Sequence, residues 1–340
     1  RKDSSSASDV YKRQATPQIQ HVGAAPDQAG QDRQRSALPV CDGAQIHVQI
    51  VNRIRHPAIM TGQIRRLRTF RRGQYRSMSV IQPLFQPGLV VSVVSHGHGD
   101  MVHALLLQLA QVSAASISRV VLTQNLPEPE PVPPAGGWPF ELLRVVNEAP
   151  LGFGANHNRA LATVTEPFVC VLNPDVMLVG HEDPFQVLVS ACCAPNIGCA
   201  YPVQIDPEGR VQGSEREVPS PVALLRRRLL GRQEIRVDWV NAACMVLPSA
   251  VWRSLGGFDE RYFMYCEDVD LCLRLRLRGL HLAKAPVRVI HAGQRASSRS
   301  LKHLGWHVQS LWCLWHSPVY ARALQFLTSA SADKGTIGAP

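Results

Sequence analysis

The segment NHNRALATVTEPFVCVLNPDVMLV, residues 156–179, decides how this chain folds. Residues 168–172 form a short apolar run with the length and the side chains of a buried strand. Asn173, Pro174 and Asp175 interrupt that run before a second apolar run begins. All three residues favour turns, so a simple turn is one interpretation. The other interpretation is that Asp175 lies at the carboxyl end of a strand, where a carboxylate can meet a divalent cation.

Strands and helices alternate around this segment. GLVVSVVS, at residues 88–95, is a continuous apolar run that ends in HGHGD, which is typical of a parallel strand buried on both faces. Further strands are predicted at residues 119–123 and 141–147, and helices are predicted after residue 100 and from about residue 154. The alternation predicts an α/β fold with a mainly parallel sheet flanked by helices. Such sheets bind ligands at the carboxyl ends of their strands.

The net charge of +10 is concentrated near the start of the chain. Residues 1–77 hold 14 Lys or Arg and 5 Asp, net +9, which leaves 22 basic and 21 acidic residues for residues 78–340. We expect residues 1–77 to be a disordered or non-native extension, because they lack hydrophobic periodicity and begin with a stretch that resembles a cloning scar. The working protein is then expected to begin near Met78. A basic arm for nucleic acid or anionic lipid is the alternative; we favour the extension and expect no nucleic-acid partner.

The cysteines and the hydropathy indicate a cytoplasmic protein. Nine cysteines are present, without a repeated metal-ligand spacing. Cys170, Cys244 and Cys272 lie among apolar residues, so we expect them to be small buried side chains. Free cysteines of this kind fit a reducing compartment. No uncharged apolar run is long enough to cross a bilayer, so we expect no membrane span.

A glycine-rich junction precedes the predicted helix. LGFGANHNRAL, residues 151–161, places Gly152 and Gly154 just before a first turn that contains Asn156 and Asn158. Glycines allow a backbone to approach a ligand closely, and the amides at a helix start favour an anion. These four residues are therefore candidates for binding a phosphate-containing ligand, although glycine before a helix is common.

An acidic cluster lies in GGFDERYFMYCEDVDLCLRLRLRG, residues 256–279. Its four carboxylates stand among aromatic and apolar residues, which costs desolvation and mutual repulsion unless a cation or a reaction needs them. A solvated loop is the alternative. The leucines alternate as in a strand, but acids at the front, arginines at the back and a following glycine are what helix ends prefer, so we predict a helix. The four acids are Asp259, Glu267, Asp268 and Asp270.

Four ordered motifs together resemble a known family: NEAPLGFGANHNRAL, VLNPDV, VNAACMVLPSAVWRSLGGFDERYFMYCEDVDLCLRLRLRG and VIHAGQRAS. They resemble the inverting nucleotide-sugar glycosyltransferases of family 2, especially the rhamnosyltransferase-like branch. The resemblance implies the GT-A fold, a Rossmann-like α/β domain expected here at residues 78–300, followed by a C-terminal helical segment and tail at residues 301–340. It also implies a metal-binding aspartate at Asp175, an acceptor-activating base at Asp268 with Glu267 beside it, and a histidine near the metal or diphosphate at His291. As a lone residue after a strand, His291 has an equal claim to a purely structural role.

The donor-binding positions of the family are only partly matched. Relatives often end the first strand in Thr-Tyr-Asn, where this chain runs from Ser95 to Asp100 as SHGHGD, and the usual Asp-Asn-x-Ser is replaced by a segment that ends in Asn125. The resemblance still makes Ser95, Asp100, Asn125 and Asn173 candidates for donor binding. The base and the sugar of the donor stay open.

The reaction implied by the resemblance is sugar transfer with inversion from a nucleoside-diphosphate sugar, such as dTDP-rhamnose. The acceptor would be a hydroxyl of a glycan or a lipid-linked molecule in cell-surface polysaccharide synthesis, and Mg²⁺ or Mn²⁺ would be the cofactor. A GT-A-fold nucleotidyltransferase is one alternative, but HGHGD lacks the basic residue expected of its glycine-rich loop. A catalytically dead nucleotide-sugar-binding protein is the other.

A last helical pattern follows the motifs, with apolar residues spaced three or four apart. One interpretation is a helix packed on the catalytic domain. The other is an interfacial helix that makes peripheral contact with the inner face of a membrane. The residues of the pattern are Leu301, Leu304, Val308, Leu311, Trp312 and Trp315.

Overall fold

The computed structural model describes residues 88–230, 236–293 and 301–335. These residues all belong to one compact unit. The expected domain boundaries at residues 78 and 300 lie outside the described residues, as does the proposed extension at residues 1–77. Those boundaries therefore stay predictions.

The first half of the fold alternates strands and helices as predicted. Three parallel pairings join its four strands, because β1 lies between β2 and β4, and β3 pairs with the far side of β2. Each predicted strand and helix in this half is confirmed to within a few residues. The elements are β1 (Leu89–Ser95), α1 (Gly99–Val112), β2 (Ile117–Gln124), β3 (Glu141–Val146), α2 (Phe153–Leu161) and β4 (Phe168–Leu172).

The second half introduces antiparallel strands. β9 runs antiparallel to both β4 and β6 in the middle of the sheet, and β5 pairs antiparallel with β10 at its edge. The full order is β3-β2-β1-β4-β9-β6-β10-β5, so the expected mainly parallel sheet is confirmed, with four parallel and three antiparallel pairings. The elements are β5 (Val176–Leu178), α3 (Pro184–Cys192), β6 (Ile197–Ile205), β9 (Cys244–Pro248), α5 (Ser249–Leu255), α6 (Glu267–Leu277) and β10 (His281–His291). Two short strands, β7 (Glu215–Arg216) and β8 (Trp239–Val240), form a separate ribbon near α4 (Pro221–Leu230).

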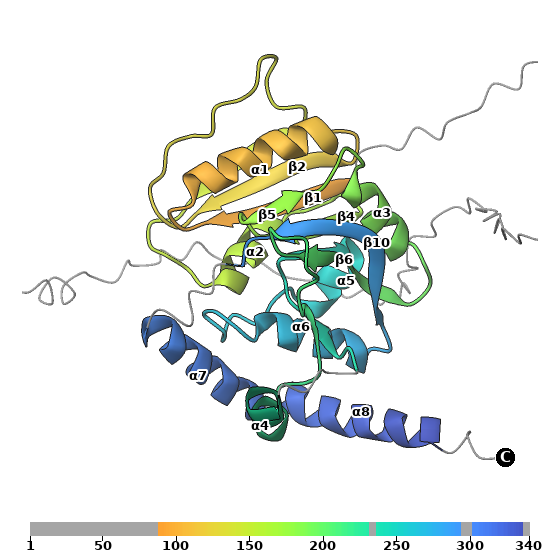
Figure 1. The fold of residues 1–340 in the computed structure, drawn as a ribbon. Helices are drawn as coiled ribbons and strands as arrows, with labels where there is room; N and C mark the ends of the chain where they lie inside the picture. The colour runs from red at the N-terminus through yellow and green to blue at the C-terminus, as the bar shows by residue number, and fades with distance from the viewer. Residues whose placement is uncertain (1–87, 231–235, 294–300, 336–340) are drawn as a thin grey trace, which may run out of the picture. The chain divides into compact units, whose positions relative to one another are not determined.

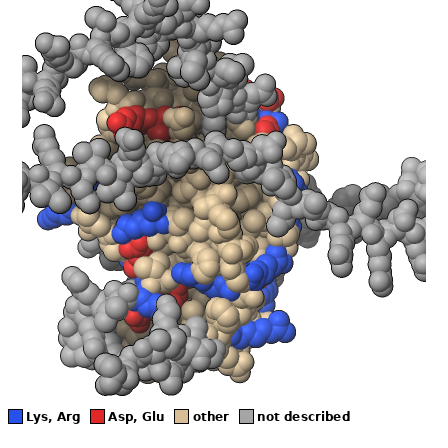
Figure 2. Space-filling view, turned by 90° about the vertical axis from the view of Figure 1, so that its right-hand side faces the viewer, with Lys and Arg blue, Asp and Glu red and all other residues tan. Residues whose placement is uncertain are grey.

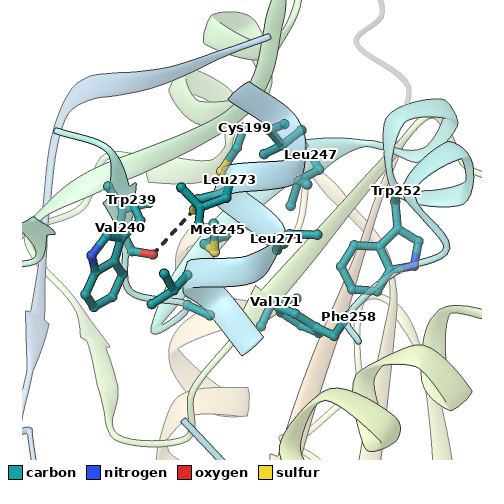
Figure 3. Close-up of a cluster of buried hydrophobic side chains, with 14 of the residues drawn as sticks. Val171, Cys199, Trp239, Val240, Met245, Leu247, Trp252, Phe258, Leu271 and Leu273 are labelled. Atoms are coloured by element: carbon teal, nitrogen blue, oxygen red, sulfur yellow. Dashed lines mark hydrogen bonds between the residues drawn. The ribbon is translucent and has the colours of Figure 1, made fainter. Parts of the chain in front are cut away.

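Both faces of the sheet are buried, which explains the continuous apolar runs. Successive residues of β1 alternate between two hydrophobic clusters, with Leu89 in one and Val90 in the other. α1 and α3 contribute to the first cluster, whereas α2, α5 and α6 contribute to the second. Figure 3 shows how Leu271 and Leu273 of α6 pack beside Met245 of β9. The expected small buried cysteines are also confirmed, since Cys170, Cys244 and Cys272 are all buried and free.

The acidic cluster begins a helix, as predicted. α6 carries three acids in its first turn and Arg274 and Arg276 in its last, a distribution that suits the helix dipole. It ends before Gly279, whose φ of 73° is left-handed. The helix choice over the leucine alternation is therefore confirmed.

Two helices follow the sheet: α7 (Leu301–Trp315) and α8 (Pro318–Gly335). α8 packs against α6, and Figure 1 draws α7, α4 and α8 in a row below α6. Within residues 88–230, 236–293 and 301–335, no helix combines the length and the apolar character that a membrane span requires.

Candidate active site

One turn of the backbone, just before β9, contacts both segments that carry the predicted acidic positions. Asn173, just past the carboxyl end of β4, donates its N–H to the carbonyl of Ala243 at 2.8 Å. The neighbouring residue, Ala242, donates its N–H to the carboxylate of Asp268. The turn before β9 is therefore hydrogen-bonded both to the end of β4 and to the start of α6. Because β9 runs antiparallel beside β4, this turn lies next to the carboxyl end of β4. Asp175 and Asp268 lie on either side of this turn.

Asp175 faces a histidine. Strand β5 pairs with β10 so that Val176 lies opposite His291, which brings the Nε2 atom of His291 to 3.5 Å from the Oδ2 atom of Asp175. Both side chains are only 15% exposed. The backbone is fixed as well, since Ala292 donates its N–H to the carbonyl of Asp175 at 3.1 Å. His291 and Asp175, the two residues expected near the metal, thus face each other in the structure, and their role toward a metal stays a prediction.

The ring of His291 is oriented by Gln212. The Nε2 atom of Gln212 donates to the backbone carbonyl of His291 at 2.7 Å, and its Oε1 atom lies 3.3 Å from the Nδ1 atom of the ring. Because an amide oxygen only accepts, this arrangement assigns the proton to Nδ1 and turns the Nε2 lone pair toward Asp175. Burial lowers the pKa of His291, and the negative charge of Asp175 opposes that effect.

A carboxylate and a neutral imidazole fit a divalent ion. Both are common ligands of divalent transition-metal ions, and the hydrogen bond to Gln212 is the kind of outer contact that orients a ligating histidine. The Oδ1 atom of Asn173 is buried and has no hydrogen-bond partner in the described part of the chain. No group of three or more His, Cys, Asp or Glu that could enclose an ion occurs among the described residues. The set therefore fits an ion that also takes oxygens from a bound phosphate.

The acid pair stands on a turn with an uncommon backbone. Tyr265 and Cys266 both have positive φ, at 74° and 67°, a conformation that non-glycine residues seldom adopt. They lead directly into α6, where Glu267 is buried and Asp268 is partly buried. Two consecutive residues in this region indicate local strain held in place by the surrounding contacts. These contacts hold the turn in one conformation and so determine the direction in which the side chains of Glu267 and Asp268 point.

Burial sets the protonation of this pair. It raises the pKa of Asp268 to about 6, against the opposing effects of the N–H groups of Val269 and Ala242 and the charge of Arg216. Burial, followed by the charge of Asp268, raises the pKa of Glu267 well above its usual range. The Oε2 atom of Glu267 also has no partner among the described residues. The pair therefore carries about one proton near neutral pH, with Asp268 as the ionised member.

A cavity of about 270 Å³ opens in front of Asp268. The guanidinium of Arg216 lies over the ring of Trp239 at 5.6 Å on one side of it. Asn241, Tyr265 and His307 complete its polar lining. These cavity residues were not predicted, because β7 and β8 are two-residue strands without a sequence pattern and α7 joins the site only through tertiary packing.

The glycine-rich junction packs against protein. A Cβ atom on Gly152 would lie 2.6 Å from the backbone oxygen of Phe263, and one on Gly154 would lie 2.8 Å from the Cβ atom of Phe258. Asn158 holds the same segment, since its side chain both accepts from the N–H of Phe258 and donates to its carbonyl at 2.8 Å. The close approach expected for a ligand is thus made by the segment that precedes the acid pair.

Of the remaining donor candidates, Ser95 and Asn125 lie at the carboxyl ends of β1 and β2, whereas Asp100 and Asn156 lie in α1 and α2. Asn156 is fully buried and its amide nitrogen donates to the Oδ1 atom of Asn125 at 3.2 Å, so both amides are engaged inside the protein. Ser95 donates to the Oε2 atom of Glu128 at 2.8 Å. Asp100 is exposed in the first turn of α1. The structure brings Ser95 and Asn125 together, since the N–H of Asn125 donates to the carbonyl of Ser95 at 2.9 Å.

Comparison with known proteins identifies relatives. The chain is 30% identical over 254 residues to the N-acetylglucosaminyl-diphospho-decaprenol L-rhamnosyltransferase of Mycobacterium tuberculosis, which covers 65% of this chain and 82% of that protein. It is 27% identical over 250 residues to the rhamnosyltransferase WbbL of Escherichia coli, covering 65% of this chain and 89% of WbbL. No protein-family model matches the chain. Among solved structures, the mannosyltransferase PcManGT of Pyrobaculum calidifontis, in complex with GDP-Man and Mn²⁺, aligns with 73% of this chain and 77% of its own, at 15% identity and a TM-score of 0.46.

Proposed function

The chain belongs to the nucleotide-sugar glycosyltransferase family that includes these rhamnosyltransferases, and from that premise we propose that it transfers rhamnose, with inversion, from dTDP-rhamnose to an acceptor hydroxyl. The observation that supports the proposal is that the turn before β9 contacts both the backbone of Asn173, two residues before Asp175, and the carboxylate of Asp268. Asp175 and His291 have the chemistry to hold a cation. Glu267 and Asp268 have the chemistry to accept a proton.

Asp175 and His291 would hold the cation, with Gln212 keeping the imidazole in the required orientation. When bound, Mg²⁺ or Mn²⁺ supplies positive charge to the departing diphosphate. Asn173 would contribute its unpartnered Oδ1 atom next to this position. Ser95 and Asn125, at the ends of neighbouring strands, would approach the nucleoside of the donor.

Asp268 would act as the general base. In the reaction, the acceptor oxygen bonds to the anomeric carbon, the bond from that carbon to the diphosphate oxygen breaks, and the hydroxyl proton passes to Asp268. A pKa of about 6 leaves this carboxyl ionised at neutral pH and keeps it close to the range in which base catalysis is efficient. Glu267, protonated beside it, removes a like charge that would otherwise oppose the ionisation of Asp268.

The cavity in front of Asp268 would receive the acceptor, either a glycan or a lipid-linked saccharide in cell-surface polysaccharide synthesis. Aromatic and cationic side chains such as Trp239 and Arg216 suit a sugar carrying an anionic group. We place the reaction in the cytoplasm, at the inner face of the membrane where the acceptor is lipid-linked. A nucleotidyltransferase has less support, because the relatives are named for the transfer of sugars.

A panel of nucleotide sugars tests the proposal. Thermal unfolding is recorded with each donor, with and without Mn²⁺, and transfer to saccharide acceptors is followed in parallel. We expect dTDP-rhamnose with Mn²⁺ to raise the unfolding temperature most. Stabilisation by another nucleotide sugar would change the assigned donor, and stabilisation by none of them would contradict the proposed activity.

A further inference from the structure

Helix α7 turns its apolar residues away from the protein. Leu301, Leu304, Val308 and Trp312, which we call the apolar stripe, are 88%, 51%, 60% and 64% exposed. At 100° per residue, their spacing places all four within about 80° of the helix circumference. α7 does pack on the catalytic domain, as one interpretation expected, but these four residues of the pattern stay largely exposed.

The packed face of α7 combines polar and apolar contacts, since Leu311, Leu314 and Trp315 pack against the hydrophobic cluster that contains α6. Ser310 is buried and donates to the carbonyl of Met264 at 2.8 Å. His303 is hydrogen-bonded through Nδ1 to the hydroxyl of Tyr265 at 2.9 Å. Only Leu314 is a fully buried leucine on this helix. A surface helix of a globular protein normally has one apolar face, turned to the core, so the exposed apolar stripe is a second apolar face that the packing of α7 does not require.

The surroundings of the stripe are apolar and basic. Val222 and Leu225 of α4 are 56% and 59% exposed. The first half of α4 lies near α7, since Leu224 of α4 and Leu311 of α7 line the same cavity. Across α4 and residues 301–327 the sequence contains five Lys or Arg and no Asp or Glu. Figure 2 draws the right-hand side of Figure 1, away from α7, and shows Lys and Arg side chains there with Asp and Glu among them. The five residues are Arg226, Arg227, Arg228, Lys302 and Arg322.

We propose that α7, together with α4, seats the protein on a bilayer surface with anionic headgroups. An exposed apolar stripe that contains a tryptophan and has Lys302 beside it on the same helix matches a helix that lies in the interface plane of a membrane. Anionic lipid complements the positive charge of Lys302 and Arg322, because residues 301–327 contain no Asp or Glu. A second copy of this chain would bring the same basic residues together, which disfavours a dimer through this face.

The position of α7 gives this surface a consequence for the proposed reaction. His307 and Leu311 of α7 line the cavity that contains Asp268. A protein seated on its apolar stripe therefore holds the cavity close to the lipid headgroups, where a lipid-linked acceptor would present its sugar. This consequence rests on the proposed function, whereas the lipid binding itself does not.

Vesicle flotation of the full chain tests the proposal independently of catalysis. Vesicles of phosphatidylcholine alone are compared with vesicles that also contain phosphatidylglycerol. The variant Val308→Gln/Trp312→Gln removes half of the stripe, and Val132→Gln/Val211→Gln is the matched control, because those valines are 69% and 65% exposed outside α7. Thermal unfolding verifies that both variants fold.

We expect the wild-type chain to float with the anionic vesicles, and the α7 variant to lose at least about tenfold in partitioning. Lys302→Gln should lose about fivefold, and only on anionic vesicles. Equal flotation of the α7 variant and its control would overturn the proposal. So would a wild-type dimer that the α7 variant dissociates while neither protein binds vesicles, because the stripe would then be an interface between two copies.

Discussion

Two acidic sites flank one turn of this protein, and they differ in what holds them. Asp175 follows a strand and faces His291, whose ring is fixed by Gln212. Asp268 opens a helix on a strained turn, where burial raises its pKa to about 6. We propose that the same residue type binds a cation in one place and takes up a proton in the other. The surroundings decide the chemistry.

Removing the base should give the largest effect. Asp268→Asn keeps the size of the side chain but cannot accept the proton, so we expect kcat to fall by about 10²- to 10⁴-fold. Steady-state kinetics with saturating donor measure the change. Asp259→Asn is the control, because Asp259 belongs to the same segment but pairs with Arg261 at the surface. Wild-type turnover in Asp268→Asn would remove the base assignment.

Weakening the proposed metal site at Asp175 and His291 should have a smaller effect than removing the base. Gln212→Ala removes both contacts that orient His291, and we expect the affinity for Mn²⁺ to fall by about 10- to 100-fold. Electron paramagnetic resonance of free Mn²⁺ during a titration reports the affinity without turnover. Gln186→Ala, an exposed glutamine on α3, is the matched control. An unchanged affinity in Gln212→Ala would mean that His291 is not a ligand oriented by Gln212.

The packing of the glycine junction predicts a loss of stability. Gly154→Ala would place a methyl group 2.8 Å from the Cβ atom of Phe258, so we expect the free energy of unfolding to fall by about 1–3 kcal/mol. Chemical denaturation measures this change. Gly213→Ala is the control, because nothing lies within 4 Å of the position that its Cβ would take. Equal stability of the two variants would show that Phe258 can move away from a methyl group at residue 154 without a loss of stability.

The raised pKa of Asp268 predicts that activity and stability change with pH in opposite directions. Activity should fall as the pH drops through about 6, because Asp268 becomes protonated and cannot act as a base. Stability should change in the opposite direction. The pKa of Asp268 is higher in the folded chain than the value of about 4 in an unfolded chain, so the folded state binds the proton more tightly and loses stability as the pH rises from about 4 toward 6. Asp268→Asn should flatten this part of the stability curve, and an unchanged curve would assign the effect to another group.

Local patterns predicted the parts of the fold that local chemistry determines. The alternation of apolar runs and helical patterns predicted β1 to β4, and the charge distribution around α6 predicted a helix against a competing leucine alternation. The family resemblance added the roles of Asp175 and Asp268, and these roles stay predictions. The antiparallel insertion of β9 was missed, because its apolar run contains no signal of strand direction.

Features that depend on distant partners could not be predicted. The left-handed backbone of Tyr265 and Cys266 has no sequence signal, since neither residue type favours it. The partner of Gly154 is Phe258, which lies more than a hundred residues further along the chain. The exposure of the apolar stripe on α7 was equally hidden, because its spacing is the same whether the helix faces a core or a membrane.

The central claim is that Asp175 binds the cation, and through it the donor, whereas Asp268 accepts the proton of the acceptor hydroxyl. Isothermal calorimetry of donor binding, with and without Mn²⁺, tests it when Asp175→Asn and Asp268→Asn are measured side by side. We predict that Asp268→Asn binds the donor as the wild-type chain does, and that Asp175→Asn loses the Mn²⁺-dependent part of the affinity. Equal losses in both variants, or an intact Mn²⁺ dependence in Asp175→Asn, would contradict this division of roles.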